Sequence, residues 1–249
     1  MNSLAKLNAD SFDPSLGDVE SEALSDHFAQ PALISRHQKL TRIFQIGFNK
    51  CGTRSLYRFL QRCGIYSAHF NRGLLALRMH ENIEAGRKPL HGKIDRFVAF
   101  TDIQRISMEG AIEGALFYKQ LYQYYPNSYF ILNTRDKEGW LRSRQRHGAG
   151  NYLNRYRKAL GIASDDELLK YWSEKWDRHH EDVPAFFADK PDRLIVFDIK
   201  EDDPQKMCDF LSLDFETRPE FFRHEGDTAS VDASEYEKNA PVKAHYDIL

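Results

Sequence analysis

The sequence has few cysteines, no long apolar run and no excess of basic residues. Its three cysteines, Cys51, Cys63 and Cys208, include no CxxC pair, which fits neither a disulfide framework nor a zinc site. No apolar run reaches the roughly 20 residues of a membrane span. Because 35 basic and 37 acidic residues give a net charge of −2, a general affinity for nucleic acid or membrane surfaces is not expected. We expect a cytoplasmic protein with no bound metal, no membrane span and no nucleic-acid partner.

The composition is that of a folded protein. Hydrophobic residues make up 41% of the 249 residues and aromatic residues 13%, which is enough for a packed core in one fair-sized domain. Residues 1–38 mix Ser, Asp, Asn and Pro with scattered Leu. We therefore expect a flexible or loosely packed N-terminal arm over 1–38 and a single domain over 39–249.

Apolar runs alternate with amphipathic stretches from residue 40 onward. The runs typical of buried strands are 43–48, 97–101, 128–133 and 194–197. Helices are expected over 56–63, 108–125, 165–188 and 204–211, with a kink or break at Pro184, and 65–96 should hold loops and a short helix. This alternation predicts an α/β fold, with a parallel sheet flanked by helices.

A glycine-rich loop joins the first expected strand to the first expected helix. It reads Gly47-Phe48-Asn49-Lys50-Cys51-Gly52-Thr53-Arg54-Ser55. Its two glycines allow a tight turn in which successive N–H groups face one concavity, while Lys50, Arg54 and the helix N-terminus add positive charge. The pattern predicts a P-loop-like strand–loop–helix that binds the phosphate of a nucleotide. An ordinary turn with incidental charges is the alternative.

The loop differs from the Walker A motif GxxxxGK[ST]. Gly47 and Gly52 have the right spacing, but Thr53 stands where the motif has its lysine. The loop's lysine, Lys50, lies between the glycines, which disfavours an ordinary ATPase or kinase. Cys51 is interpreted as a small loop-filling residue rather than a nucleophile, because the sequence shows no base partner for it.

A second candidate anion site follows the strand expected at 128–133. Arg135 lies just beyond that strand, where parallel sheets bind their ligands. Ser143 lies eight residues later, two helical turns on, so both side chains could converge on one anion. A salt bridge from Arg135 to Asp136 or Asp102 is the alternative role.

Together the two segments resemble the sulfotransferase family over about residues 42–212. The run Lys50-Cys51-Gly52-Thr53-Arg54 is similar to the family's 5′-phosphosulfate loop, in the form seen in heparan-type members. Arg135 and Ser143 match the arginine and serine that hold the 3′-phosphate there. The donor-binding residues that the resemblance implies are Asn49, Lys50, Cys51, Gly52, Thr53, Arg54, Ser55, Arg135 and Ser143.

The resemblance implies transfer of the sulfuryl group of 3′-phosphoadenosine 5′-phosphosulfate (PAPS) to a hydroxyl or amine. The acceptor would be a small molecule or a glycan, and the product adenosine 3′,5′-bisphosphate. Two family features are missing: the arginine–lysine–glycine triplet near the C-terminus and the catalytic histidine motif. The competing functions are a small-molecule kinase with a degenerate P-loop and a catalytically silent nucleotide-binding protein.

Two catalytic roles need candidates. Negative charge grows on the bridging oxygen as the sulfuryl group leaves, and Lys50 is placed to stabilise it. The acceptor needs a base. Asp102, at the end of the strand expected at 97–101, is the first candidate, and His69 and His91 are its rivals. The alternative is that Asp102 caps a helix starting near Ser107, or orients Arg135 or Arg105.

Overall fold

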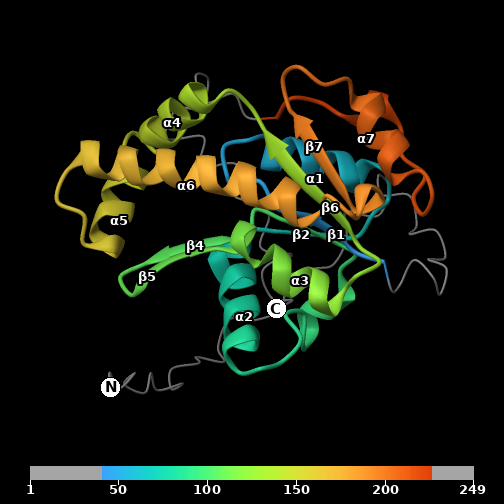
Figure 1. Ribbon diagram of the computed structural model, residues 1–249, viewed down its shortest axis with the longest axis horizontal. Coiled ribbons are helices and arrows are strands. Elements are labelled where there is room, and N and C mark those ends of the chain that lie inside the picture. The colour runs from blue at the N-terminus through green and yellow to red at the C-terminus, as the bar shows by residue number, and fades with distance from the viewer. Residues whose placement is uncertain (1–40, 226–249) are drawn as a thin grey trace, which may run out of the picture.

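The computed structural model describes residues 41–225, within which a five-stranded parallel sheet carries helices on both faces (Figure 1). The strand order is β2-β3-β1-β6-β7. The strands are β1 (Ile43–Gln45), β2 (Ser67–His69), β3 (Ala99–Thr101), β6 (Tyr129–Thr134) and β7 (Leu194–Asp198). The expected α/β class is confirmed. The expected arm at 1–38 lies outside the described residues, as does the end of the domain expected over 39–249.

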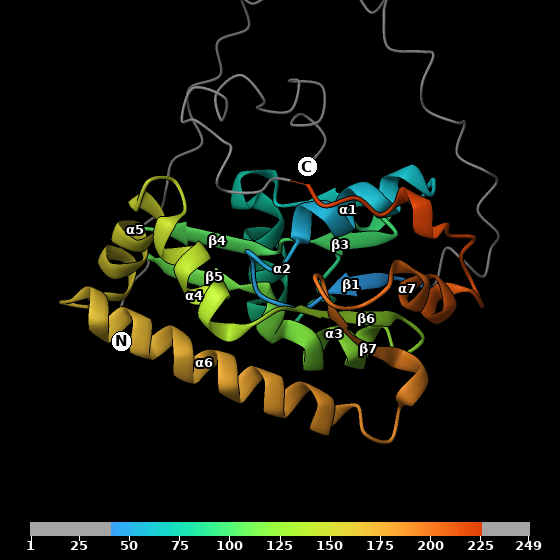
Figure 2. The same ribbon diagram turned by 90° about the horizontal axis from the view of Figure 1, so that it is seen from above.

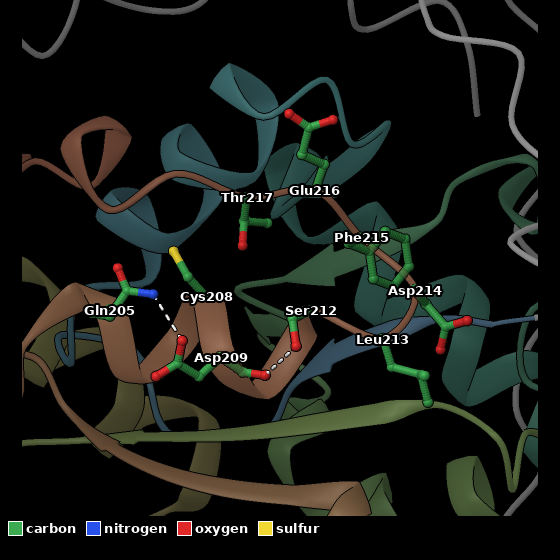
Figure 3. Close-up of a pocket in the computed structure, with 9 residues that line it drawn as sticks. All are labelled: Gln205, Cys208, Asp209, Ser212, Leu213, Asp214, Phe215, Glu216 and Thr217. Carbon is green, nitrogen blue, oxygen red and sulfur yellow. Dashed lines mark hydrogen bonds between the residues drawn. The ribbon is translucent and has the colours of Figure 1, made fainter.

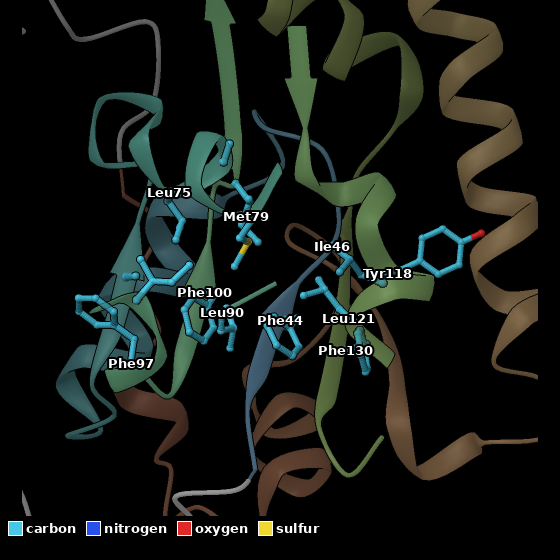
Figure 4. Close-up of a cluster of buried hydrophobic side chains, with 14 of the residues drawn as sticks. Phe44, Ile46, Leu75, Met79, Leu90, Phe97, Phe100, Tyr118, Leu121 and Phe130 are labelled. Atoms are coloured by element: carbon cyan, nitrogen blue, oxygen red, sulfur yellow. The ribbon is translucent and has the colours of Figure 1, made fainter. Parts of the chain in front are cut away.

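Helices cover the sheet on both sides because its strands are apolar on both. On one side pack α1 (Thr53–Arg62) and α7 (Pro204–Leu211), against strand residues such as Ile43 and Ile131. On the other side pack α2 (Leu74–Glu84), α3 (Tyr118–Tyr124) and the second half of α6 (Asp165–Phe186). Figure 4 shows this second core, with Phe44, Phe100 and Phe130 of the sheet near Leu121 of α3 and Met79 of α2. Alternate strand residues thus fill two cores.

A third cluster of buried residues lies beyond the carboxyl ends of the strands. It joins α4 (Lys137–Arg146), α5 (Asn151–Leu160) and the first half of α6 to Phe48 and Cys51 of the loop after β1. The hairpin of β4 (Gln104–Ser107) and β5 (Gly110–Glu113) lies on the same side, at the left of Figure 1. Seen from above, α6 runs along one side of the molecule (Figure 2). The remaining elements are short 3₁₀ turns: η1 (Asn71–Gly73), η2 (Lys93–Arg96), η3 (Gly114–Phe117), η4 (Pro191–Arg193) and η5 (Pro219–Phe221).

The structure corrects several expected elements. The helix expected over 108–125 is wrong in its first half, where β5 and η3 precede the short α3. Two glycines explain this: Gly110 has a φ of 140°, and a Cβ on Gly114 would lie 2.2 Å from Ile103 Cγ2. Strand β2 was missed because Ser67-Ala68-His69 is not an apolar run, and α5 was not expected. Pro184 does not interrupt α6, which ends two residues later. No helix in 41–225 is long and apolar enough to cross a membrane.

Candidate functional site

The residues that follow β1, β2 and β3 share an unusual backbone conformation. Lys50, Asp102 and the consecutive residues 70–72 have φ between 46° and 68°. Residues other than glycine rarely adopt this left-handed backbone conformation. Each such residue costs about 1–3 kcal/mol, and such strain gathers at functional sites. Since the strands are parallel, their carboxyl ends meet at one edge of the sheet, where ligands of such folds bind.

The loop after β1 has its carbonyl groups bound by side chains of β6 and the following segment. Asn49 O accepts from Trp140 Nε1 (2.9 Å), Lys50 O from Arg135 Nη1 (3.4 Å) and Cys51 O from Asn133 Nδ2 (2.6 Å). In a trans peptide the N–H points opposite to the C=O. The N–H groups of residues 50–52 therefore point away from these partners. Consecutive N–H groups of this kind make an anion-binding concavity.

Helix α1 begins directly after this concavity. Its N-cap is Gly52, in the left-handed region with a φ of 73°, and its first turn contains no acidic residue and no side-chain cap bond. The helix dipole and the first N–H groups thus remain available to an anion. Arg54 is exposed in that turn. Ser55 is instead buried, and its hydroxyl accepts a hydrogen bond from Glu225 N (2.8 Å).

Gly47 fixes the start of the loop against β6. Asn133 Oδ1 accepts from Gly47 N (3.0 Å) and from Gln45 Nε2 (2.6 Å). Gln45 also accepts from the Asp102 N–H through its Oε1 (2.7 Å). These two buried amides, Gln45 and Asn133, therefore join the ends of β1, β3 and β6. Sequence reasoning missed both, although a polar residue inside each apolar run was a usable signal.

Gly47→Ala should destabilise the protein by about 1–3 kcal/mol, the usual cost of overpacking. A Cβ at Gly47 would lie 2.0 Å from Asn133 O and 2.3 Å from Asn133 Oδ1, so the loop must move. Lys170→Ala is the control, because the Lys170 side chain is 79% exposed on α6. Thermal melts should place Gly47→Ala below Lys170→Ala. Equal melting temperatures would contradict the close approach of loop and strand.

The side chain of Asn49 is held by a buried ion network. Arg144 Nε donates to Asn49 Oδ1 (2.8 Å), and Arg144 Nη2 pairs with Glu113 Oε1 (2.6 Å). Lys175 Nζ lies 2.6 Å from the other oxygen of Glu113. Burial alone would raise the pKa of Glu113, but Arg144 and Lys175 outweigh burial and hold that pKa at about 2. Asn49 thus supports the loop through its side-chain oxygen, whereas its buried Nδ2 has no hydrogen-bond partner among residues 41–225.

Lys50 extends toward a histidine that sequence reasoning missed. Lys50 Nζ lies 3.5 Å from His147 Nδ1, at the C-terminal end of α4. Burial lowers the pKa of Lys50; the Asp102 carboxylate opposes this, and Arg54 and Arg135 add to it. Burial also lowers the pKa of His147, to about 4, with help from Lys50. The ring is therefore neutral near pH 7 and does not repel the ammonium. The sequence signal for His147 was its position one helical turn after Ser143.

Asp102 is a nearly buried carboxylate beside the loop, with 13% of its side chain exposed. Burial raises its pKa to about 6, against the opposing effects of Lys50 and of the hydrogen bond from Gln104 Nε2. A small cavity under the loop is lined by Asp102, Asn49 and Arg144, among others. Ser107 ends β4 rather than starting a helix, so the alternative that Asp102 caps a helix there is wrong.

The two rival histidines lie in different places. His69 ends β2, and its Nε2 lies 3.9 Å from Asp102 Oδ2. His91 is exposed in the segment that leads into β3, so it lies toward the amino end of that strand. The structure therefore brings His69 to the strand edge that carries Lys50 and Asp102, and leaves His91 toward the opposite edge.

Arg135 follows β6 directly, and Ser143 lies within α4. Arg135 Nε is 3.8 Å from Asp136 Oδ1. The salt bridge to Asp136 considered as the alternative role of Arg135 is therefore present, but it is long. The same buried Nε has no hydrogen-bond partner among residues 41–225. Both residues thus remain candidates for binding an anion, with Arg135 next to the loop through its bond to Lys50 O.

Comparison with known proteins identifies the family of the chain. A family model described as a sulfotransferase domain matches residues 42–170, more than half of the chain. The chain belongs to the sulfotransferase family. Among curated proteins none matches the sequence. The matched range of this sulfotransferase contains the loop, Asp102, Arg135, Ser143 and His147, but not β7 or α7.

Cys51 of the sulfotransferase is fully buried in the third core cluster. Burial raises the pKa of its thiol well above the ordinary value. The side chain therefore fills space under the loop, and nucleophilic chemistry at Cys51 is not supported. Among residues 41–225, no group of three or more His, Cys, Asp or Glu side chains is arranged to hold a metal ion.

A second hollow in the sulfotransferase lies around the end of α7 (Figure 3). Its lining includes Asp209, Asp214 and Glu216, with the exposed Leu213 at its rim. Because α7 starts after the carboxyl end of β7 and runs back along the sheet, this hollow lies away from the loop. Three carboxylates would repel an anionic donor, so the hollow does not compete with the loop as a nucleotide site.

Proposed function

We propose that the chain transfers a sulfuryl group from PAPS to a hydroxyl or amine of a small-molecule or glycan acceptor. Residues 49–55, Arg135 and Ser143 bind the donor, with Asn49 shaping the loop and Cys51 contributing its backbone N–H. The proposed donor site is supported by the N–H groups of residues 50–52, which point away from the side chains that bind the loop carbonyls. A phosphosulfate is the kind of anion that such a loop and helix N-terminus accommodate.

Lys50 and the loop serve the leaving group. When the bond between sulfur and the bridging oxygen breaks, negative charge grows on that oxygen, and the Lys50 ammonium stabilises it without reorganisation. His147 accepts from Lys50 in its neutral form and holds the ammonium in place. Arg135, anchored to the carbonyl of Lys50, and Ser143 bind the 3′-phosphate on the α4 side.

Asp102 serves the acceptor. Its carboxylate takes the proton of the acceptor while the acceptor oxygen or nitrogen attacks sulfur. A pKa of about 6, raised by burial, suits a base that is ionised near pH 7 and readily protonated during the reaction. Strand β3 carries Asp102 and strand β6 carries Arg135, on opposite sides of β1, so acceptor and 3′-phosphate are bound on opposite sides of the loop.

One observation carries the proposal: Lys50 and Asp102 follow the neighbouring strands β1 and β3 at one edge of the sheet, where Gln45 of β1 accepts from the Asp102 N–H, next to the anion-binding loop. The Asp102 carboxylate raises the pKa of Lys50, and Lys50 lowers the pKa of Asp102. An in-line transfer needs a cation at the leaving oxygen and a base at the attacking atom. These two side chains supply that pair.

The direct experiment is an activity assay with PAPS and a panel of phenols, alcohols, sugars and amines. We expect at least one acceptor to gain a sulfuryl group, with equal release of adenosine 3′,5′-bisphosphate by chromatography. If the bisphosphate binds while no acceptor in the panel reacts, the catalytically silent alternative gains support.

Arg135→Ala should weaken binding of adenosine 3′,5′-bisphosphate by about 2–4 kcal/mol, as expected when a buried charge loses its partner. Binding of adenosine 5′-phosphate should hardly change. Arg142→Ala is the matched control, because Arg142 lies on α4 but is 57% exposed. Calorimetry with both nucleotides measures the difference. Equal losses for the two nucleotides would show that Arg135 does not read the 3′-phosphate.

A further inference from the structure

The carboxylate proposed as the base has a histidine beside it on the neighbouring strand. His69 ends β2, and its backbone is paired with Thr101, the residue before Asp102. This register places His69 Nε2 3.9 Å from Asp102 Oδ2. The distance is too long for a hydrogen bond, so the protonation state of the ring decides what the two groups can do.

The hydrogen bonds around His69 assign its tautomer. Thr101 Oγ1 donates its single hydrogen to Ala68 O (3.1 Å), and it lies 2.9 Å from His69 Nδ1. A hydroxyl has one hydrogen, so while Thr101 donates to the carbonyl it can only accept from His69. This arrangement places the ring proton on Nδ1. In the neutral ring Nε2 then carries a lone pair, and that lone pair faces Asp102.

The surroundings of His69 hold its ring in place and keep it uncharged. The Tyr57 ring of α1 stacks on it, with centroids 4.6 Å apart and planes 16° from parallel. The charged groups that face His69 are Arg54 and Arg58 from α1 and Asp102 after β3. Burial, with Arg54 and Arg58, lowers the pKa of His69 to about 3, so the ring is neutral near pH 7.

We propose that His69 is a positioning residue for Asp102, whose protonated carboxyl donates a hydrogen bond to His69 Nε2. The inference rests on the proposed function, in which Asp102 is the base. As the acceptor O–H or N–H bond breaks, its proton goes to Asp102; the acceptor atom bonds to sulfur, and the bond from sulfur to the phosphate oxygen breaks. While Asp102 is ionised, two hydrogen-bond acceptors face each other, which fits the 3.9 Å separation. Protonation supplies the missing hydrogen.

The test is nuclear magnetic resonance on the full chain, with labelled histidine nitrogens and aspartate carboxyl carbons. His69 should show the neutral Nδ1–H tautomer. In His69→Asn, which retains a donor toward Thr101 but lacks an acceptor that reaches Asp102, the titration midpoint of Asp102 should fall by about one pH unit. The sign follows because a hydrogen bond to the protonated carboxyl raises its pKa, and about one unit is the usual size of one such bond.

Two further variants make the test specific. His69→Gln, whose amide oxygen reaches toward the position of Nε2, should restore most of the midpoint, and His91→Asn should leave it unchanged. A neutral Nε2–H tautomer, or an unchanged midpoint in His69→Asn, overturns the proposal. If His69→Asn fails to fold, the tautomer and the glutamine variant still decide. Full turnover in Asp102→Asn would instead refute Asp102 as the base. The tautomer of His69 and the titration of Asp102 in the wild type would not change, so the two failures can be told apart.

Discussion

Lys50→Ala should lower turnover by about 10²–10³-fold, the usual effect of removing one preorganised donor at a developing negative charge. Nucleotide affinity should fall less, because the backbone N–H groups of the loop and Arg135 remain. Alanine tolerates the φ of 68° at this position no worse than lysine does, so the loop should keep its shape. Steady-state kinetics with PAPS and an acceptor from the panel measure the effect.

Two controls separate the charge of Lys50 from its position. Lys50→Arg keeps a cation but moves it from the ammonium site near His147, so it should recover only part of the activity. Lys137→Ala removes a lysine of α4 that is ion-paired with Asp177 at the surface and should leave turnover unchanged. Near-normal turnover in Lys50→Ala would remove Lys50 from the catalytic step.

Asp102→Asn should lower turnover by about 10²–10⁴-fold, the range that general base catalysis contributes. Affinity for adenosine 3′,5′-bisphosphate should be unchanged, and the acidic limb of the pH–rate profile, expected near pH 6 from the raised pKa, should disappear. Asparagine is among the residues best suited to the φ of 51° found here. The variant therefore removes basicity and little else.

The stability of Asp102→Asn gives an independent check. In the unfolded chain Asp102 ionises near its ordinary pKa of 3.8, whereas burial raises the value in the folded chain to about 6. Between those values the unfolded state loses its proton first, so stability falls as pH rises through this window and the penalty persists above it. Asp102→Asn should thus melt no lower than the wild type at pH 7. A melt several degrees lower with the acidic limb retained would make Asp102 structural.

The sequence was sufficient for the features that depend on local pattern. The apolar runs located β1, β3, β6 and β7, and the bounds expected for α7 agree with those observed, because Pro204 and the capping side chain of Asp203 define its start. The glycine-rich loop lies between β1 and α1 as predicted, but α1 begins at Thr53, so residues 53–55 of the expected loop form the first turn of the helix. Its role in donor binding, and those of Arg135 and Ser143, remain predictions that the variants above test.

What the sequence could not supply depends on contacts between distant segments. The 3.5 Å approach of Lys50 to His147 joins residues 97 positions apart, and that of His69 to Asp102 depends on pairing between β2 and β3. Arg144 carries no local sign that it is buried and bound to Asn49. The hairpin that replaced an expected helix packs against α2 and α5, and these contacts cannot be read from the local sequence.

Donor specificity is decided by thermal stabilisation with three nucleotides at equal concentration. These are adenosine 3′,5′-bisphosphate, ADP and ATP with magnesium, each measured on the wild type and on Arg135→Ala. A ligand that binds only the folded state raises the melting temperature according to its affinity. We expect the largest rise for the bisphosphate, with most of that rise lost in Arg135→Ala. A larger rise with ATP and magnesium, and none with the bisphosphate, would contradict this expectation and favour a kinase.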